Sequence, residues 1–394
     1  MREEDDWSSK RLKEIMSLGS LQATKMRDVA LKTKDVIKLT SGEPNFVTPS
    51  HIREAAKKAL DEGNTFYTPT SGIPEFREAI ADKIEEDFGV QVDPESEVMA
   101  TPGAIEGIFL AIMCTVNPGE EVLIPEPGYV GYAPCVKFAG GNPISVPLDE
   151  ERGFELKPSE IEDRITEKTK MIILNSPSNP TGMVIDLKNL KVIAEIAKKH
   201  DLLVLSDEAY EKMVYDDARH YSIFALPEMR NRTIMVGSFS KTYAMTGWRI
   251  GYLVAEKSLV QNMLKIQGSI VLCTNGVVQK AAVAALKGPQ DSIAAMVKEF
   301  DKRRHFIVDG LNSIDGFSCQ LPKGAFFVFP NITEFGLDSA KMTQFLIEEA
   351  KVAVYPGIAY GNLGEGHIRL TYAASIKDIE TALQRIEVSV KKLR

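Results

Sequence analysis

Cysteine, histidine and long apolar runs are all scarce in this chain. Its 394 residues include four cysteines and five histidines, with no Cys-x-x-Cys pair and no paired metal-ligand spacing. We therefore expect no metal site, and we interpret the cysteines as buried thiols in a reducing compartment. No apolar stretch reaches the roughly 20 residues that cross a bilayer. The acidic first residues contain no apolar segment, so a secretory signal is not expected.

An excess of positive charge is also absent. The formal net charge is −8 and no block of lysine and arginine stands out, so a nucleic-acid-binding face is not expected. What is present is an ordinary globular composition, 44% hydrophobic and 26% charged. A chain of this length exceeds one compact core, so two domains with a cleft between them are expected. The chain is predicted to be soluble and cytoplasmic.

Short apolar runs alternate with amphipathic helical patterns through the middle of the chain. Strands are predicted at residues 97–100, 121–124, 171–174, 202–205, 233–236 and 250–254, and helices at 104–116, 187–200 and 257–286. This alternation predicts an α/β fold, with a mainly parallel sheet sandwiched by helices. In such sheets ligands bind beyond the carboxyl ends of the strands.

The pattern changes after Gly288 and predicts a smaller α+β domain. A long helix at 291–311 precedes short strands at 325–329, 353–355 and 367–370 and a last helix at 376–393. We expect residues 46–288 to form the large, ligand-binding domain and residues 289–394 the small C-terminal α+β domain. Residues 1–45 are expected to be an N-terminal segment that joins the small domain.

Lys241 carries the strongest chemical signal in the sequence. It follows the apolar run 233–237 and is therefore expected at the carboxyl end of a buried strand. Ser238 and Ser240 lie beside it and Arg249 follows. A phosphorylated aldehyde cofactor needs such groups, because its carbonyl forms a Schiff base with an amine and its phosphate binds hydroxyls and a guanidinium. Taken alone, Lys241 is equally consistent with an ordinary surface lysine.

Polar side chains follow two other predicted strands. Asp207 ends the hydrophobic stretch 202–206 and, if buried, needs a cationic partner such as a protonated pyridine ring. A helix N-cap is the alternative role. Tyr210 could bond a ring hydroxyl or belong to the core. Asn179 begins an Asn-Pro-Thr-Gly loop whose rigid backbone would fix its amide as a donor, although a plain turn is the alternative.

The segment Gly103, Ala104 and Ile105 leads from a strand into a helix. Its free backbone N–H groups and the positive end of the helix dipole suit a phosphate, but many strand-to-helix turns are rich in glycine. Tyr129 follows another strand end, where it could stack on a planar ring or lie in the core.

Arg369, Gly42 and Tyr67 complete the set of candidates. Arg369 lies within an apolar strand, and its guanidinium fits a carboxylate in bidentate fashion; an internal salt bridge is the alternative. Gly42 belongs to a turn-forming loop that could close over a ligand. Tyr67 lies in a polar aromatic loop and has no role from sequence chemistry alone.

Together these motifs resemble the class I aminotransferases, the fold-type-I enzymes that use pyridoxal 5′-phosphate. The resemblance rests on Asn-Pro-Thr-Gly at 179–182, Asp-Glu-x-Tyr at 207–210, Ser-x-Ser-Lys at 238–241 and the later Arg369. It covers the chain from Gly42 to Arg369 and is greatest to the aromatic and broad-range enzymes of archaea.

The resemblance implies a role for each candidate. Lys241 would carry the cofactor and move a proton at the substrate Cα, while Asp207 would pair with the pyridine nitrogen. Asn179 and Tyr210 would bind the ring oxygen, with Asn179 also facing the substrate. The remaining groups would stack on the ring (Tyr129), hold the phosphate (Ser238, Ser240, Arg249 and the backbone of Gly103, Ala104 and Ile105) and bind the substrate α-carboxylate (Arg369 with Gly42).

The resemblance also implies a homodimer with shared sites, because Tyr67 would reach the phosphate of the neighbouring subunit. It implies cis peptide bonds before Pro127 and Pro180. One position departs from part of the family: some aspartate-preferring bacterial relatives have a lysine where Ile105 stands. This weakens the aspartate interpretation without excluding it.

The expected activity is a ping-pong transfer of the amino group from an aromatic or broad-range L-amino acid to a 2-oxo acid such as 2-oxoglutarate. An aspartate- or alanine-preferring aminotransferase is the first alternative. A β-eliminating lyase or decarboxylase on the same scaffold is the second, and a regulatory module that binds the cofactor without catalysis is the third.

Overall fold

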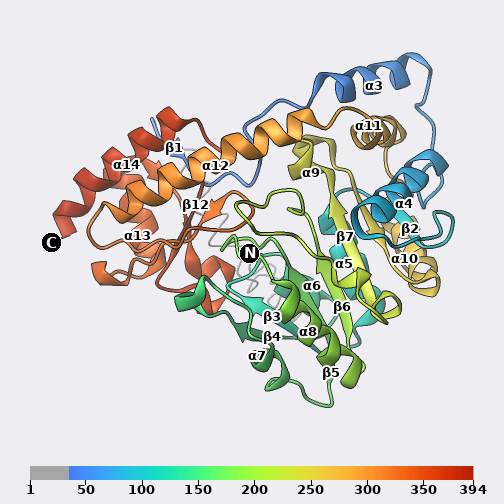
Figure 1. Ribbon diagram of the computed structural model, residues 1–394, viewed down its shortest axis with the longest axis horizontal. Helices are drawn as coiled ribbons and strands as arrows, with labels where there is room; N and C mark the ends of the chain where they lie inside the picture. The colour runs from blue at the N-terminus through green and yellow to red at the C-terminus, as the bar shows by residue number, and fades with distance from the viewer. Residues whose placement is uncertain (1–34, 394) are drawn as a thin grey trace, which may run out of the picture.

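The computed structural model describes residues 35–393 and is organised around a seven-stranded sheet (Figure 1). The strand order is β2-β8-β7-β6-β5-β3-β4, and β8 alone runs opposite to the other strands. The predicted mainly parallel sheet is therefore confirmed. The bounds are β2 Val98–Thr101, β3 Glu121–Glu126, β4 Asn142–Pro147, β5 Thr169–Asn175, β6 Leu203–Asp207, β7 Thr233–Ser238 and β8 Gly251–Val254.

Both faces of the large sheet are buried, as continuous apolar strands predict. In β5, Met171 and Ile173 pack into the core on one face, and Ile172 and Leu174 pack into the core on the other. The first face is covered by α5 (Ala104–Thr115), α6 (Tyr132–Phe138) and α10 (Lys257–Ile270). The second is covered by α4 (Pro74–Phe88) and α8 (Leu187–Lys199).

Four further helices complete this part of the molecule. Helix α11 packs against both α3 and α4, and Figure 1 shows the three at the end of the molecule away from the C-terminus. Their bounds are α3 Ser50–Asp61, α7 Pro158–Glu162, α9 Phe239–Thr242 and α11 Gly276–Lys287. The short helix α9 directly follows β7, and the side chain of Ser238 caps it by accepting a hydrogen bond from the backbone N–H of Ser240. Lys241 lies in this helix.

The C-terminal elements form a second core beside the large sheet (Figure 1). Three antiparallel strands in the order β11-β12-β9 pack with three helices. The bounds are β9 Phe327–Val328, β10 Val352–Ala353, β11 Tyr355–Pro356, β12 Ile368–Thr371, α12 Asp291–Asn312, α13 Ser339–Phe345 and α14 Ile376–Val390. Strand β1 (Ile37–Lys38) pairs with β10, so the described part of the N-terminal segment lies against this core. Residues 1–34 lie outside the described residues, and the domain limits at 45/46 and 288/289 stay a prediction.

Two details of the expected fold are wrong. The single helix predicted at 257–286 is two helices, because the Asn275 side chain accepts from the Val278 N–H and starts α11 as a new helix. Strand β4 was not expected; it is an edge strand that pairs only with β3 and contains Pro143 and Pro147, a composition that edges tolerate.

The burial of the cysteines also differs in part from expectation. Cys135 and Cys319 are buried as predicted, whereas Cys114 and Cys273 are only half-buried. No helix within residues 35–393 has both the length and the apolar character needed to cross a membrane.

Candidate active site

A cavity of about 320 Å³ opens where three neighbouring strands end. Asn175, Asp207 and Ser238 are the last residues of β5, β6 and β7, and all three line it. The sheet therefore brings side chains together that are far apart in the sequence, at the carboxyl edge where parallel sheets bind ligands.

Twelve of the fourteen candidate site residues line this cavity. They are Gly42, Ala104, Ile105, Tyr129, Asn179, Asp207, Tyr210, Ser238, Ser240, Lys241, Arg249 and Arg369. Gly103 does not line the cavity, but its backbone lies against the guanidinium of Arg249, which does. Tyr67 is 85% exposed and borders a separate surface hollow with Val271 and Cys273.

Lys241 points its amine into the cavity. Its Nζ donates a hydrogen bond to the carbonyl oxygen of Gly42, so the loop that contains Gly42 closes over the amine. Burial lowers the pKa of Lys241 to about 8, and the nearby positive charge of Arg369 adds to this effect. A substantial fraction of the amine is therefore neutral near pH 8, which is the form that can attack a carbonyl or accept a proton.

Asp207 is buried at the end of β6 and lines the cavity. Its Oδ2 accepts from the hydroxyl of Tyr132 at 2.6 Å, and its Oδ1 accepts from the N–H of Ala209 at 3.1 Å. Burial raises the pKa of Asp207, and these two hydrogen bonds oppose the increase. A cation beside this carboxylate would favour its ionised form.

One end of the cavity is built to hold an anion. Helix α5 begins after Gly103, and among the described residues no side chain caps it, so the N–H groups of its first turn remain available. Arg249 borders the same end, held by a hydrogen bond from Nη1 to the Thr246 carbonyl at 3.0 Å. A Cβ on Gly103 would lie 2.5 Å from Arg249 Nη2, so only glycine lets the helix start and the guanidinium come this close.

Arg369 lies in β12 and also lines the cavity. Its Nη1 donates to Asn179 Oδ1 at 3.2 Å and its Nη2 donates to the Thr40 carbonyl at 2.6 Å. Its Nε is buried and has no hydrogen-bond partner among the described residues. The guanidinium carbon lies 4.9 Å from the ring centre of Tyr355. Arg369 thus has no internal carboxylate partner among these contacts, so it can bind an anionic ligand.

Tyr129 and Tyr210 add aromatic walls. Burial raises the pKa of Tyr129 to about 12 and raises that of Tyr210 further, so both hydroxyls stay protonated at neutral pH. The rings of Tyr210 and Phe326 meet edge to face with centroids 5.5 Å apart.

The predicted cis peptide bonds before Pro127 and Pro180 are confirmed, and the bond between Ser176 and Pro177 is cis as well.

Two polar residues that organise this site were not among the predicted ones. Tyr132 donates a hydrogen bond to Asp207. Tyr129 lies three residues earlier, and nothing in the local sequence shows which of the two tyrosines would contact Asp207. Asn175 donates to the Asp207 carbonyl at 3.1 Å and accepts from the Asn179 N–H at 2.9 Å, which joins β5, β6 and the following loop. The signal for Asn175 was present, because it ends an apolar strand just before the rigid loop.

A cluster of two carboxylates and a histidine lies away from the cavity, and it was not predicted from the sequence. Asp216, Asp301 and His305 lie close enough to hold a cation. However, both carboxylates accept hydrogen bonds from the buried Arg304, which already supplies their positive charge.

Comparison with known proteins identifies the family. Residues 34–386 match the model of the family described as aminotransferase class I and II. An aspartate aminotransferase of Pyrococcus abyssi is 46% identical, over 92% of this chain and 94% of the relative. The aromatic-amino-acid aminotransferase 2 of Thermococcus litoralis is 43% identical, over 93% and 95%.

Solved structures agree. An aromatic aminotransferase from Pyrococcus horikoshii superposes with a TM-score of 0.90 at 45% identity, covering 94% of this chain and all of the other. An aspartate aminotransferase from Thermus thermophilus, solved with maleate, also gives a TM-score of 0.90, at 34% identity. This chain belongs to the class I and II aminotransferase family, and it is a pyridoxal-phosphate-dependent aminotransferase of fold type I.

The residues of the cavity fit the cofactor that this family implies. The open start of α5, Ser238 and Arg249 offer a donor set suited to a phosphate. The buried Asp207, whose pKa burial raises, suits a protonated ring nitrogen. The amine of Lys241 suits an aldehyde. The family match favours an aminotransferase over the lyase and the regulatory module.

Proposed function

We propose that this enzyme transfers the amino group of an aromatic L-amino acid, within a broad substrate range, to a 2-oxo acid, for which 2-oxoglutarate is the expected acceptor. The proposal includes a ping-pong order, in which the first oxo acid leaves before the second one binds. Any amino-acid or 2-oxo-acid substrate presents the same α-carboxylate to Arg369, so one site can serve both halves of the reaction.

The distribution of charge in the cavity carries the substrate proposal. Among the described lining residues the cationic side chains are Lys241, Arg249 and Arg369. We assign Lys241 to the cofactor aldehyde and Arg249 to its phosphate. The guanidinium of Arg369 remains, and it binds the substrate α-carboxylate. Much of the remaining lining is apolar or aromatic, and it includes Ile105, Ile108, Val130, Tyr355 and Tyr360. A flat apolar side chain fits such a surface better than a second carboxylate does.

The residues of the chain divide the chemistry between them. When bound, pyridoxal phosphate supplies an aldehyde for the amino group and a ring that withdraws electrons from Cα. Asp207 would keep the ring nitrogen protonated, and Arg369 would fix the substrate so that its Cα–H faces Lys241. The neutral form of the Lys241 amine, which burial favours by lowering the pKa to about 8, would accept the proton from the substrate Cα. The loop at Gly42 would exclude water.

A panel of amino donors tests the substrate proposal. The change of cofactor absorbance in single-turnover half-reactions should give a kcat/KM for phenylalanine and tyrosine at least about tenfold above that for aspartate, a difference of about 1.4 kcal/mol. Ile105→Lys should raise the value for aspartate by about tenfold, because it adds a cation at the mouth. Ile105→Met is the uncharged control. A wild-type preference for aspartate over phenylalanine would contradict the proposal.

We also propose that the enzyme is a homodimer in which Tyr67 completes the partner's site. Support comes from the exposure of Tyr67 and Phe66, 85% and 86%, which do not line the cavity of their own chain. Hybrid dimers of Lys241→Ala and Tyr67→Phe test this. Such a hybrid keeps one intact site only if Tyr67 acts across the interface, so mixing two impaired variants should restore activity. No recovery in purified hybrids would exclude a shared site.

A further inference from the structure

The segment that follows β6 alternates between two environments. Asp207 and Tyr210 face the cavity, whereas Glu208 and Glu211 are not part of its lining. Both glutamates are nonetheless buried, with 2% and 8% of their surface exposed. Burying a carboxylate is costly unless it is paired and hydrogen-bonded, so the partners of these two residues are informative.

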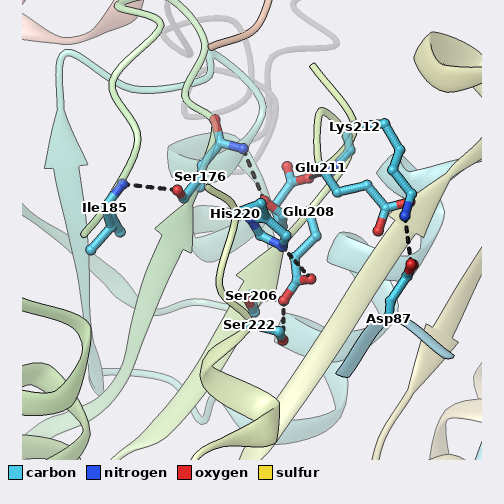
Figure 2. A network of polar contacts seen from close by, with 12 residues as sticks. Asp87, Ser176, Ile185, Ser206, Glu208, Glu211, Lys212, His220 and Ser222 are labelled. Atoms are coloured by element: carbon cyan, nitrogen blue, oxygen red, sulfur yellow. Dashed lines mark hydrogen bonds and ion pairs between the residues drawn. The ribbon is translucent and has the colours of Figure 1, made fainter. Parts of the chain in front are cut away.

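Glu208 is fully hydrogen-bonded on the side away from the cavity. Figure 2 shows Ser206, Ser222 and His220 around its carboxylate. Oε1 accepts from Ser206 at 2.8 Å and Ser222 at 2.6 Å, and Oε2 lies 2.8 Å from His220 Nε2. Burial alone would raise the pKa of Glu208, but the charge of His220 and these hydrogen bonds outweigh it and hold the pKa below its ordinary value. The backbone N–H of Glu208 also donates to Val236 in β7.

Glu211 is held in a similar way by α4. Its Oε2 lies 2.9 Å from Nζ of Lys83, and both side chains are buried. Lys83 also pairs with Asp87 one helical turn later, and Lys212 reaches Asp87 from the segment after β6, as Figure 2 shows. Burial would lower the pKa of Lys83, but Glu211 and the other neighbouring acids raise it well above its ordinary value.

We propose that Glu208 and Glu211 are positioning residues, which fix Asp207 and Tyr210 against the cofactor through buried pairs with His220 and Lys83. Each glutamate directly follows the cofactor-facing residue that it fixes. A displacement of either glutamate therefore moves a neighbouring cofactor contact, and a shift of about 1 Å in such a contact is enough to lower a rate by about a hundredfold. This inference rests on the proposed roles of Asp207 and Tyr210.

The segment after β6 is held at two separate points, by the Glu208–His220 pair and by the Glu211–Lys83 pair. Asp207 is the last residue of β6, and Tyr210 lies beyond the strand in a turn closed by the Glu211 N–H to Glu208 carbonyl bond at 3.1 Å. The strand ladder holds the backbone of Asp207 between β5 and β7, but β6 ends at this residue and the ladder does not reach Tyr210. The pair with His220 fixes the strand end, and the pair with Lys83 fixes the turn against α4.

The amide of Ala209 offers a readout that does not depend on activity, because it donates to Asp207 Oδ1. Hydrogen exchange of the peptide that contains it should be measured in the holoenzyme, together with cofactor dissociation and the pH titration of the cofactor absorbance. In Glu208→Gln we expect about tenfold faster exchange, about tenfold weaker cofactor binding and a shifted absorbance titration. Ser222→Ala, which removes one hydrogen bond and uncovers no charge, should change the same quantities less.

Glu75→Gln is the matched control. It breaks an exposed 2.8 Å pair with Lys280 by the same substitution and should leave all three quantities within about twofold. Glu211→Gln should weaken cofactor binding and lower kcat, with little change in KM. If Asp207→Asn is impaired while both glutamate variants and Ser222→Ala match wild type, the inference is wrong and the proposed function stands. If Asp207→Asn leaves absorbance and cofactor binding unchanged, the proposed role of Asp207 fails and the inference fails with it.

Discussion

The hydroxyl of Tyr132 donates a 2.6 Å hydrogen bond to Oδ2 of Asp207, from a residue 75 positions earlier in the chain. Tyr132 is the first residue of α6, and Asp207 is the last of β6. Burial and the negative charge of Asp207 raise the pKa of Tyr132 well above its ordinary value, so the phenol stays a donor at every working pH. This bond favours the ionised form of a carboxylate whose pKa is raised by burial.

Replacing Tyr132 by Phe tests the bond directly. A hydrogen bond to a charged group contributes about 1.5–3 kcal/mol, so we expect the half-reaction with glutamate to slow by about tenfold and the absorbance titration of the cofactor to shift. Single-turnover spectroscopy measures both quantities. Tyr215→Phe is a matched control, because this buried hydroxyl bonds the Ala325 carbonyl away from the cavity. Equal effects of the two substitutions would show that only stability had been lost.

The lowered pKa of Lys241 predicts how cofactor capture depends on pH. Only the neutral amine attacks an aldehyde, so the rate at which apoenzyme binds pyridoxal phosphate covalently should rise about tenfold per pH unit below pH 8. It should level off above that value. Nα-acetyl-lysine, with the ordinary value of 10.5, is the reference. A midpoint near 10.5 in the enzyme would show that burial and Arg369 do not act as stated, and Lys241→Ala should form no covalent product.

Substituting Lys for Arg369 keeps the charge and removes the planar fork. We expect KM for the amino donor to rise by at least about tenfold while kcat changes less, because the lost interaction binds the α-carboxylate throughout the reaction. Steady-state kinetics with two donors measures this. Arg385→Lys, at a half-buried position on α14 that bonds the Asp35 carbonyl, is the control. Unchanged kinetics in Arg369→Lys would remove its role as the carboxylate ligand.

A methyl group on Gly103 should disturb the anion-binding end of the cavity. Gly103 has φ 85° and its Cβ would meet Arg249 Nη2, whereas Gly119 has φ 87° and no atom within 4 Å of its Cβ. Gly103→Ala and Gly119→Ala both place a side chain at positive φ, at a cost of order 1–3 kcal/mol, and only the first displaces Arg249. Equilibrium dialysis should show cofactor binding weakened about tenfold in Gly103→Ala alone. Equal loss in both variants would assign the effect to stability.

Much of the site could be predicted because the relevant signals are local. Asp207 and Lys241 each follow an apolar run, and parallel strands place their carboxyl ends at one edge. Tyr132 and Asn175 were not singled out, because the bonds that define them join segments far apart in the sequence. Whether Tyr129 or Tyr132 contacts Asp207 depends on how α6 packs on the sheet. This packing cannot be predicted from the periodicity of the sequence.

The sequence by itself determined the strand ends, the amine, the carboxylate and the two arginines, because strand periodicity and turn residues act over a few positions. Only the tertiary structure decided which partners these groups have. It placed the Gly42 carbonyl on Lys241 and buried Glu208 against His220. It also left Tyr67 outside the cavity of its own chain. Buried polar groups bind whichever partner the packing of distant elements brings within about 3 Å, and that proximity is a property of the folded chain alone.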